Sequence, residues 1–351
     1  METAIADPQV QDTRSGKSSI VGQEWRPGNY DLRDTWIPVA HSPHVTGKPI
    51  RRMVHSHPVF LWRDGGRPLA AEFHPDALGS GQCRGGELTG GSGYFPVHER
   101  YNYVWMWYGN PDNAHEALIP DVPYLPRAGK PLPRNMWGQI YFNCSYELVQ
   151  ENLLDLVHAD YLHSDIIGDE ENDDDRVYVE SDSETVTMIR EVSNKTIPPL
   201  LRFLGVPAKK ADYRAVAHVH LRSGVVVLYG KFMPGFAQPL FHPLVPESRY
   251  VSRNNFTFNI TGASPIARHG FPLLSYVIGP QDDFMMKPQN PKYQARGERR
   301  DVSSRFDAAD SRYRMVMAKL IQRQKEGDYS YLSDADPGQD IAGLLDCPRV
   351  D

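Results

Sequence analysis

The sequence has few cysteines, no long apolar segment and no excess of basic residues, and each absence excludes a class of protein. Only Cys83, Cys144 and Cys347 occur, and their odd number and wide spacing give no disulfide framework. This cysteine usage predicts a reducing compartment. No apolar run approaches the roughly 18 to 20 residues that a membrane span requires, and the N-terminus has no signal-peptide pattern.

The charge balance argues against nucleic acid as a partner. The formal net charge is -6, whereas binding to phosphates requires a basic face. The apolar fraction of 40% and the charged fraction of 23% are ordinary for a globular protein. We therefore expect a cytoplasmic protein that binds neither nucleic acid nor a membrane.

Proline and glycine are frequent, with 29 and 28 residues, which favours strands and loops over a helical bundle. Apolar runs at residues 58–62 and 103–108 predict strands, the second buried on both faces, and residues 273–278 belong to a later series of strand-like segments. Helical spacing predicts helices within residues 146–163 and at about residues 304–325. The predicted fold class is α+β, with a small β-rich N-terminal domain before a larger antiparallel-sheet domain with flanking helices.

Composition divides the chain into five segments. Residues 111–135 hold six prolines and predict an extended connection between two domains. The five segments are a mobile tail, a β domain, this connection, the main domain and an irregular C-terminal tail, at residues 1–29, 30–110, 111–135, 136–330 and 331–351.

One helical segment contains side chains that bind metals. Asp155 and His158 are three residues apart, so they share a helix face. His158 and His163 are five apart, which is about 140° around a regular helix. The two imidazoles converge only if the helix bends, bulges or ends between them. Together with a carboxylate they would form the triad that leaves open positions on Fe(II), although the spacing alone leaves open that both are ordinary helix residues.

The wider sequence resembles the Rieske non-haem iron oxygenases. Asp-x-x-His-x-x-x-x-His at residues 155–163, preceded by Asn-Leu-Leu, is similar to their iron-binding motif. Residues 93–107 resemble the strand that closes their Rieske domain, and residues 281–286 resemble the segment that donates the third iron ligand. The resemblance covers about residues 36–325 and, within the family, is strongest to the vanillate-demethylase-like, homo-oligomeric oxygenase subunits.

The resemblance implies a mononuclear Fe(II) site and assigns residues to it. The implied ligands are two histidines and one aspartate: His158, His163 and Asp282. Asp283 is the alternative for the third ligand. Asp155 matches the aspartate that links one subunit's iron to the neighbouring subunit's cluster, and there it would hold an imidazole N–H and fix the orientation of the ring. Asn152, one helical turn earlier, would line the same pocket.

One feature of that family is missing from the sequence. A Rieske [2Fe-2S] cluster needs Cys-x-His and Cys-x-x-His, and neither occurs here, where Cys83 is the single cysteine before residue 111. We expect a degenerate Rieske-like domain without its own cluster, in which His55, His57, His74 and His98 are ordinary residues. Electrons would then come from a cluster-bearing electron-transfer protein or a homologous oxygenase subunit, in a trimer or hetero-oligomer.

Three functions follow from these observations. The first is an oxygenase subunit that hydroxylates or oxidatively demethylates an aromatic or other apolar small molecule. Its candidate pocket residues are apolar and lie on later segments: Phe232, Met233, Phe256, Phe258, Met285 and Met286. The second is a non-catalytic paralogue that assembles with a complete oxygenase. The third is a zinc or iron hydrolase with Asp155 or Asp160 as its general base; the resemblance favours the first.

Overall fold

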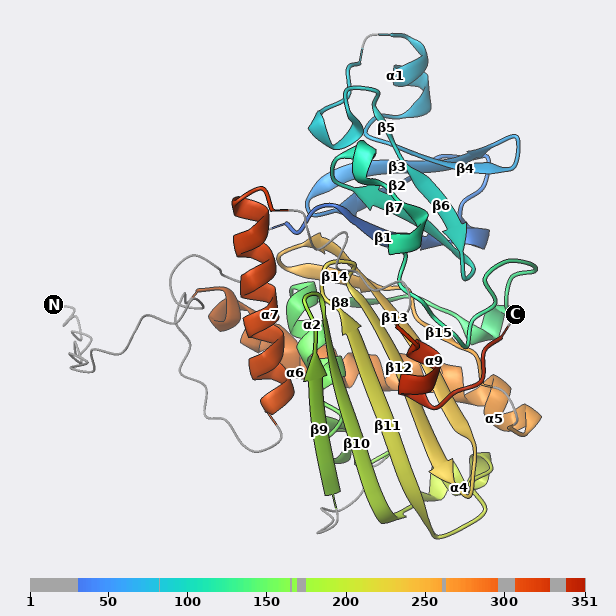
Figure 1. Cartoon of the computed structure of the whole chain (residues 1–351). Helices are drawn as coiled ribbons and strands as arrows, with labels where there is room; N and C mark the ends of the chain where they lie inside the picture. Colours follow the sequence, from blue (N-terminus) through green and yellow to red (C-terminus); the bar gives the residue numbers. More distant parts are fainter. Residues whose placement is uncertain are drawn as a thin grey trace, which may run out of the picture.

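The computed structural model describes residues 31–81, 83–164, 166–168, 175–260, 263–295, 307–328 and 339–350. Its strands form three antiparallel sheets, two in an N-terminal domain and one in a larger domain (Figure 1). This architecture confirms the predicted α+β class. The predicted tail at residues 1–29 lies outside the described residues. Among the described helices, none combines the length and the apolar character needed to cross a membrane.

The N-terminal domain is a pair of small sheets that share one apolar core. The strand orders are β1-β7-β6 and β2-β3-β4-β5. Its elements are β1 (Thr35–His41), η1 (Ser42–His44), β2 (Ile50–Val54), β3 (His57–Asp64), β4 (Arg67–Ala71), α1 (Pro75–Gly79), η2 (Glu87–Thr89), β5 (Tyr94–Phe95), β6 (Val97–Arg100) and β7 (Tyr103–Tyr108).

Strand β7 is buried along its whole length, as its sequence predicted. Val104 and Met106 point into the core of the N-terminal domain. Trp105 and Trp107 point the other way, into a core shared with the large sheet. The strand therefore joins the two domains through apolar packing, because alternate side chains of a strand point to opposite faces.

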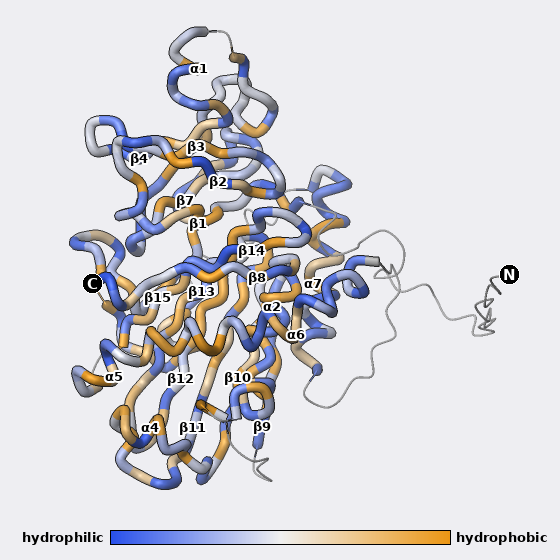
Figure 2. The backbone as a smooth tube through the Cα atoms, turned by 180° about the vertical axis from the view of Figure 1, so that it is seen from behind, coloured by the Kyte–Doolittle hydropathy of each residue, from blue (hydrophilic) through white to orange (hydrophobic). Residues whose placement is uncertain are grey.

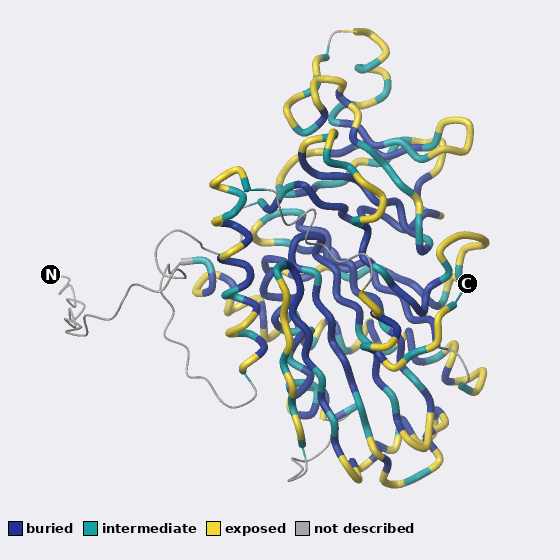
Figure 3. Tube along the Cα trace, viewed as in Figure 1, coloured by how far each residue is buried: buried dark blue, intermediate teal, exposed yellow. Residues whose placement is uncertain are grey.

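The larger domain is built on a sheet with the strand order β8-β14-β13-β12-β11-β10-β9, and β15 pairs with β13 beside this path. The strands are β8 (Ile140–Phe142), β9 (Asp175–Ser181), β10 (Thr185–Thr196), β11 (Lys210–His220), β12 (Val225–Met233), β13 (Ala237–Ser248), β14 (Val251–Asn254) and β15 (Thr257–Phe258). Figure 3 shows the central strands as mostly buried and the edge strand β9 as partly exposed.

The helices of the larger domain lie mainly on one face of this sheet (Figures 1 and 2). Apolar side chains of α2, α6 and α7 pack there against β10 and β11. The helices are α2 (Tyr146–Leu154), α3 (His158–Leu162), α4 (Pro199–Leu204), α5 (Pro265–Gly270), η6 (Phe271–Leu274), α6 (Ser275–Ala295), α7 (Ala308–Lys325) and α9 (Ile341–Leu345). Short α9 packs on the opposite face, where Ile341 and Leu345 are buried.

The prediction of a strand at residues 273–278 was wrong. These residues end η6 and begin α6, a helix that contains Pro280, Pro288 and Pro291. Its prolines and apolar run concealed the helical period, and packing of Met286 and Tyr293 against the core of the domain stabilises the helix instead. The predicted helix at the end of the domain is α7, whose described part ends at the expected residue.

Two segments predicted to be irregular are packed against the large sheet. The proline-rich connection contains the short helices η3 (Pro111–Asn113), η4 (Glu116–Leu118) and η5 (Arg134–Met136), and its Val122 and Leu125 are buried in the core beneath β7. The described part of the C-terminal segment contains α9, which was expected to be irregular. Both corrections have one cause, because a few apolar side chains suffice to anchor a short segment to a large sheet.

Candidate metal centre

A break between two helices places the two histidines of the motif. Helix α2 ends at Leu154 and α3 begins at His158. The Asp155 carboxylate accepts the backbone N–H of Val157 at 2.9 Å and that of His158 at 3.3 Å, which stabilises the start of α3. His163 follows the last residue of α3, with φ -113° and ψ 29°. The helix therefore starts at one histidine and ends before the other, and their ring centroids lie 5.4 Å apart.

The two imidazoles converge on one carboxylate oxygen from α6. Asp282 Oδ1 lies 3.1 Å from His163 Nε2 and 3.5 Å from His158 Nε2. One ligand atom from each of the three residues fits within 4.8 Å, and this is the one group of three potential metal ligands among the described residues. Two ligand atoms each about 2.1 Å from one ion lie roughly 3.0 to 3.4 Å apart at right or tetrahedral angles. The two distances from Asp282 Oδ1 are therefore close to those between ligand atoms around a single divalent ion.

The hydrogen bonds of the rings leave both Nε2 atoms directed at that point. His163 Nδ1 lies 2.8 Å from Gln281 Oε1, and His158 Nδ1 contacts the main-chain oxygen of Asp155. Both oxygens accept hydrogen bonds, so each Nδ1 carries a proton and each Nε2 faces the carboxylate. When the ring is neutral, with its one proton on Nδ1, Nε2 would offer a lone pair to a bound metal. Metal-binding histidines have this arrangement, and the donor set fits a divalent transition metal.

The electrostatics of the cluster favour an ionised carboxylate. Burial by itself raises the pKa of Asp282, but hydrogen bonds and charge from His158 and His163 outweigh burial and bring this pKa to about 2. Burial lowers the pKa of His158, and the Asp282 carboxylate more than compensates, so the net shift is upward. The Asp282 carboxylate, 5% exposed to solvent, is therefore ionised and can bind a cation.

The residues around this cluster separate the two candidates for the third ligand. Asn152 Nδ2 donates to Asp282 Oδ1 at 3.2 Å. Besides lining the pocket, as expected, this asparagine therefore holds the carboxylate in place. Asp283 instead accepts hydrogen bonds from the backbone N–H and the side-chain amide of Asn143. The structure thus brings Asp282 to the histidines and directs Asp283 elsewhere.

Two sequence expectations about this cluster need correction or addition. The imidazole of His158 contacts the main-chain oxygen of Asp155, whereas the carboxylate of Asp155 was expected to hold it. Gln281 orients His163 but had no expected role beyond its place before Asp282. An amide adjacent to a ligand in sequence gives little signal, because its contact depends on how α6 is rotated against α3.

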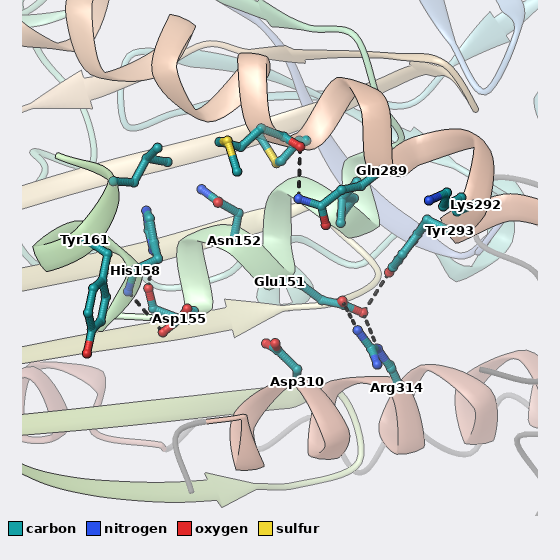
Figure 4. A pocket seen from close by; sticks show the side chains of 14 residues that line it. Glu151, Asn152, Asp155, His158, Tyr161, Gln289, Lys292, Tyr293, Asp310 and Arg314 are labelled. Carbon is teal, nitrogen blue, oxygen red and sulfur yellow. Dashed lines mark hydrogen bonds and ion pairs between the residues drawn. The ribbon is translucent and has the colours of Figure 1, made fainter. Parts of the chain in front are cut away.

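A groove of about 760 Å³ opens on one side of the centre, between α2, α6 and α7 (Figure 4). Asn152, Asp155 and His158 lie at one end of it, and Arg314 pairs with Glu151 at the other, with distances of 2.7 and 2.9 Å. Burial, with the nearby charges of Glu151 and Asp155, raises the pKa of Asp310 in this groove to about 8. The groove therefore has both polar and apolar walls and opens from the candidate metal centre to the surface.

A separate cavity of about 140 Å³ lies between the centre and the large sheet. Apolar side chains from several elements form most of its wall: Ile140, Phe142, Leu153, Leu156, Ile167, Leu228, Leu240, Phe256, Phe258, Phe271, Leu274 and Ile278. Dry protein cavities of roughly 150 Å³ hold a benzene molecule. This cavity therefore has the size of one aromatic ring, and His158, His163 and Asp282 form part of its lining.

Three polar side chains line this apolar cavity: Gln238 and His242 from β13, and Asn254 from β14. Asn254 Nδ2 lies 3.0 Å from His242 Nδ1. Because an amide nitrogen donates, His242 Nδ1 accepts and the ring proton resides on Nε2. Burial lowers the pKa of His242 to about 4, so the ring is neutral near pH 7. Within the described part of the chain, Gln238 Nε2 is buried and has no acceptor.

The predicted pocket residues divide into three groups. Phe256 and Phe258 line the cavity. Met285 and Met286 line the groove on the other side of the centre. Phe232 and Met233 line neither: the first belongs to the core beside α4, and the second is 41% exposed.

Three of the histidines considered above in the N-terminal domain have different partners. His55 pairs with Asp31 at 3.1 Å, and His98 lies 3.4 Å from Glu116. His74 accepts a backbone N–H at the start of α1.

Comparison with known proteins gives a consistent family. Residues 142–323, just over half of the chain, match the family described as vanillate O-demethylase oxygenase C-terminal domain. A vanillate O-demethylase oxygenase subunit from Pseudomonas sp. strain HR199 is 28% identical over 48% of this chain and 56% of its own length. The oxygenase component of dicamba O-demethylase from Stenotrophomonas maltophilia is 29% identical over 38% of this chain and 48% of its own. The chain thus spans about half the length of the curated relatives that it matches.

Solved structures share the fold along most of the chain. Dicamba monooxygenase bound to 3,6-dichlorosalicylic acid superposes with a TM-score of 0.69 at 20% identity, over 84% of this chain and 98% of that one. NdmA of Pseudomonas putida CBB5 with caffeine superposes with a TM-score of 0.59 at 15% identity, over 86% of this chain and 94% of that one. The similarity includes both domains, because the coverage exceeds the length of either one.

Proposed function

The chain belongs to the family defined by the vanillate O-demethylase oxygenase C-terminal domain, and from this premise we propose that it is an oxygenase subunit that holds one Fe(II). The ligands in this proposal are His158, His163 and Asp282. The observation that carries it is the convergence of two imidazole Nε2 atoms on one buried carboxylate oxygen. Two histidines and one carboxylate leave open positions on Fe(II). The bound metal would supply the one-electron chemistry with O2 that protein side chains cannot perform.

The substrate in this proposal is a small aromatic or other apolar molecule that is hydroxylated or oxidatively demethylated. The cavity supports it, because aromatic and aliphatic walls of ring size lie directly beside the three ligands. The N–H groups of Gln238 and His242 would bind an acceptor atom of the substrate and fix which of its carbons faces the metal. The apolar wall would exclude water from the reacting atoms.

The electrons in this proposal come from an iron-sulfur cluster on another protein or on a homologous subunit. The sequence motifs for a cluster, Cys-x-His and Cys-x-x-His, do not occur in the chain. The groove beside Asp155 and His158, which is separate from the substrate cavity, supports a docking position (Figure 4). Asp155 would join the two proteins there, because it contacts a ligand ring and also borders the groove.

The test is substrate-dependent oxygen uptake by the full chain with a reduced cluster-bearing partner and a panel of methoxylated aromatic compounds. The proposal predicts uptake coupled to product formation, which is lost in Asp282→Asn and kept in Asp283→Asn. Oxygen uptake that is equal in the wild type and in Asp282→Asn would refute it. Restoration of a homologous oxygenase's activity by Asp282→Asn as effectively as by the wild type would favour the non-catalytic paralogue.

A further inference from the structure

A buried cluster of four charged residues lies behind α3, the helix that starts at His158 and ends before His163. Its members come from α3, from the first residue of β9 and from β10: Asp160, Asp175, Arg190 and Lys195. Arg190 and Lys195 are each 2% exposed and Asp160 is 7% exposed. The two positive and two negative charges balance, which is the condition under which charges persist in a protein interior.

Arg190 binds the chain on both sides of His158. Its Nη1 donates to the main-chain oxygen of Leu156 at 2.9 Å. Its Nη2 donates to Asp160 Oδ2 at 2.5 Å. These contacts lie two residues before and two residues after His158, so the guanidinium spans the point where α3 begins. A planar group with donors in fixed directions constrains that turn more tightly than a single ammonium group can.

The rest of the cluster holds Arg190 and Asp160 in place. Asp175 accepts from Arg190 Nε at 3.0 Å and from its Nη2 at 2.5 Å. Lys195 Nζ donates to the second oxygen of Asp160 at 2.6 Å. Both carboxylates therefore have charged partners, and Arg190 is anchored to the sheet from the side opposite α3.

A β-bulge brings Lys195 to this cluster. Residues five apart on a regular strand point to opposite faces, so Arg190 and Lys195 should not meet. The pairing of β10 with β11 shifts between Val192 and Lys195, and Asn194 within that shift has φ 54°. The extra residue turns Lys195 onto the face of Arg190, next to α3. Because of the bulge, Lys195 becomes a second positively charged partner of Asp160.

We propose that Arg190 is a positioning residue of the metal centre, which acts through Leu156 and Asp160 to fix α3 so that His158 and His163 converge. This inference rests on the proposed metal site. Histidines five residues apart do not share a face of a regular helix, so they converge only if the helix starts and ends at particular residues. The spacing of the histidines does not determine where those ends lie. Buried ion pairs add little net stability compared with apolar packing. The inferred effect of the cluster is therefore to fix the position of α3, and not to stabilise the fold.

The experiment compares Arg190→Lys with Arg222→Lys in the full chain. Arg222 is a matched control because it is 5% exposed and pairs with Glu184 at 2.6 Å, apart from the residues of the metal centre. The readouts are the dissociation constant for Co(II), measured anaerobically, and the absorption bands of bound Co(II), which report ligand geometry. We expect Arg190→Lys to raise this constant at least tenfold and to shift the bands. We expect Arg222→Lys to change neither, at a similar loss of thermal stability.

A second variant covers the case in which Arg190→Lys does not fold. The double variant Asp160→Asn/Lys195→Met removes one charge of each sign, so the buried cluster stays balanced with Arg190 and Asp175 alone. We expect the same weakening of Co(II) binding, because α3 loses its charged contact with Arg190. A Co(II) affinity within about twofold of the wild type in either folded variant would overturn the inference, as would an equal loss in Arg222→Lys. If the wild type itself fails to bind Co(II), the proposed metal site fails instead.

Discussion

Replacement of Asp282 by asparagine tests which side chains form the metal site, and it requires no knowledge of the substrate. Asp282 Oδ1 is the atom nearest to both histidine Nε2 atoms, at 3.1 and 3.5 Å. Its neighbour Asp283 has the same side chain but binds Asn143. Asp283→Asn is therefore a control with the same chemical change one residue away.

The expected magnitude follows from binding linkage. A metal that binds only the folded state stabilises it by about 2.7 kcal/mol when its free concentration is 100 times its dissociation constant. Removal of a partner outside the ligand set weakens metal binding roughly 10- to 100-fold, so loss of a ligand should weaken it at least 100-fold. At the same metal concentration, the stabilisation of Asp282→Asn then falls to about 0.4 kcal/mol or less.

The assay is anaerobic thermal unfolding with and without Co(II) or Fe(II). We expect the wild type and Asp283→Asn to gain the same increase in melting temperature from the metal, and Asp282→Asn to gain almost none. Equal metal-induced stabilisation of the two variants would refute the assignment. A loss confined to Asp283→Asn would transfer the third ligand to that residue.

Three further results are expected. Asn152→Ala removes the 3.2 Å hydrogen bond to Asp282, so Co(II) titration should show roughly tenfold weaker binding; unchanged affinity would mean that Asn152 only lines the groove. Gln238→Leu should weaken binding of an aromatic substrate that carries an acceptor group by roughly tenfold, with little effect on one without it, as measured by the ratio of their kcat/KM values. Asp310→Asn should raise the melting temperature at pH 7 by at least about 2 °C and leave it unchanged near pH 3.5. A folded-state pKa of about 8 means that the wild type loses stability as pH rises from about 4 to 8, and equal gains at both pH values would contradict this cause.

The group of three potential ligands could be predicted from the sequence because a short motif and a separate acidic segment carry it. The positions of His158, His163 and Asp282 follow from the resemblance, and the structure places the three together. The expectation that the helix must bend, bulge or end between the two histidines corresponds to the end of α3 at Leu162, directly before His163. The resemblance supplied these positions, because the spacing alone leaves open that both histidines are ordinary helix residues.

Other features of the centre depend on contacts between distant segments. The strand predicted at residues 273–278 became part of η6 and α6 because tertiary packing outweighs local preference. Gln281 reaches His163 across 118 positions in sequence, and Lys195 reaches Asp160 only because a bulge reverses its side-chain direction. Neither contact leaves a periodic pattern in the sequence, so neither could be derived from it.

The measurement that tests the central claim most directly is the content of iron and acid-labile sulfide per chain, in protein purified without oxygen. It is made on the wild type and on His158→Ala. The account predicts about one iron and no sulfide in the wild type, and loss of the iron in His158→Ala. Iron accompanied by sulfide would contradict the expectation that the chain holds no cluster of its own. Absence of iron from the wild type, or iron retained in His158→Ala, would contradict the metal centre itself.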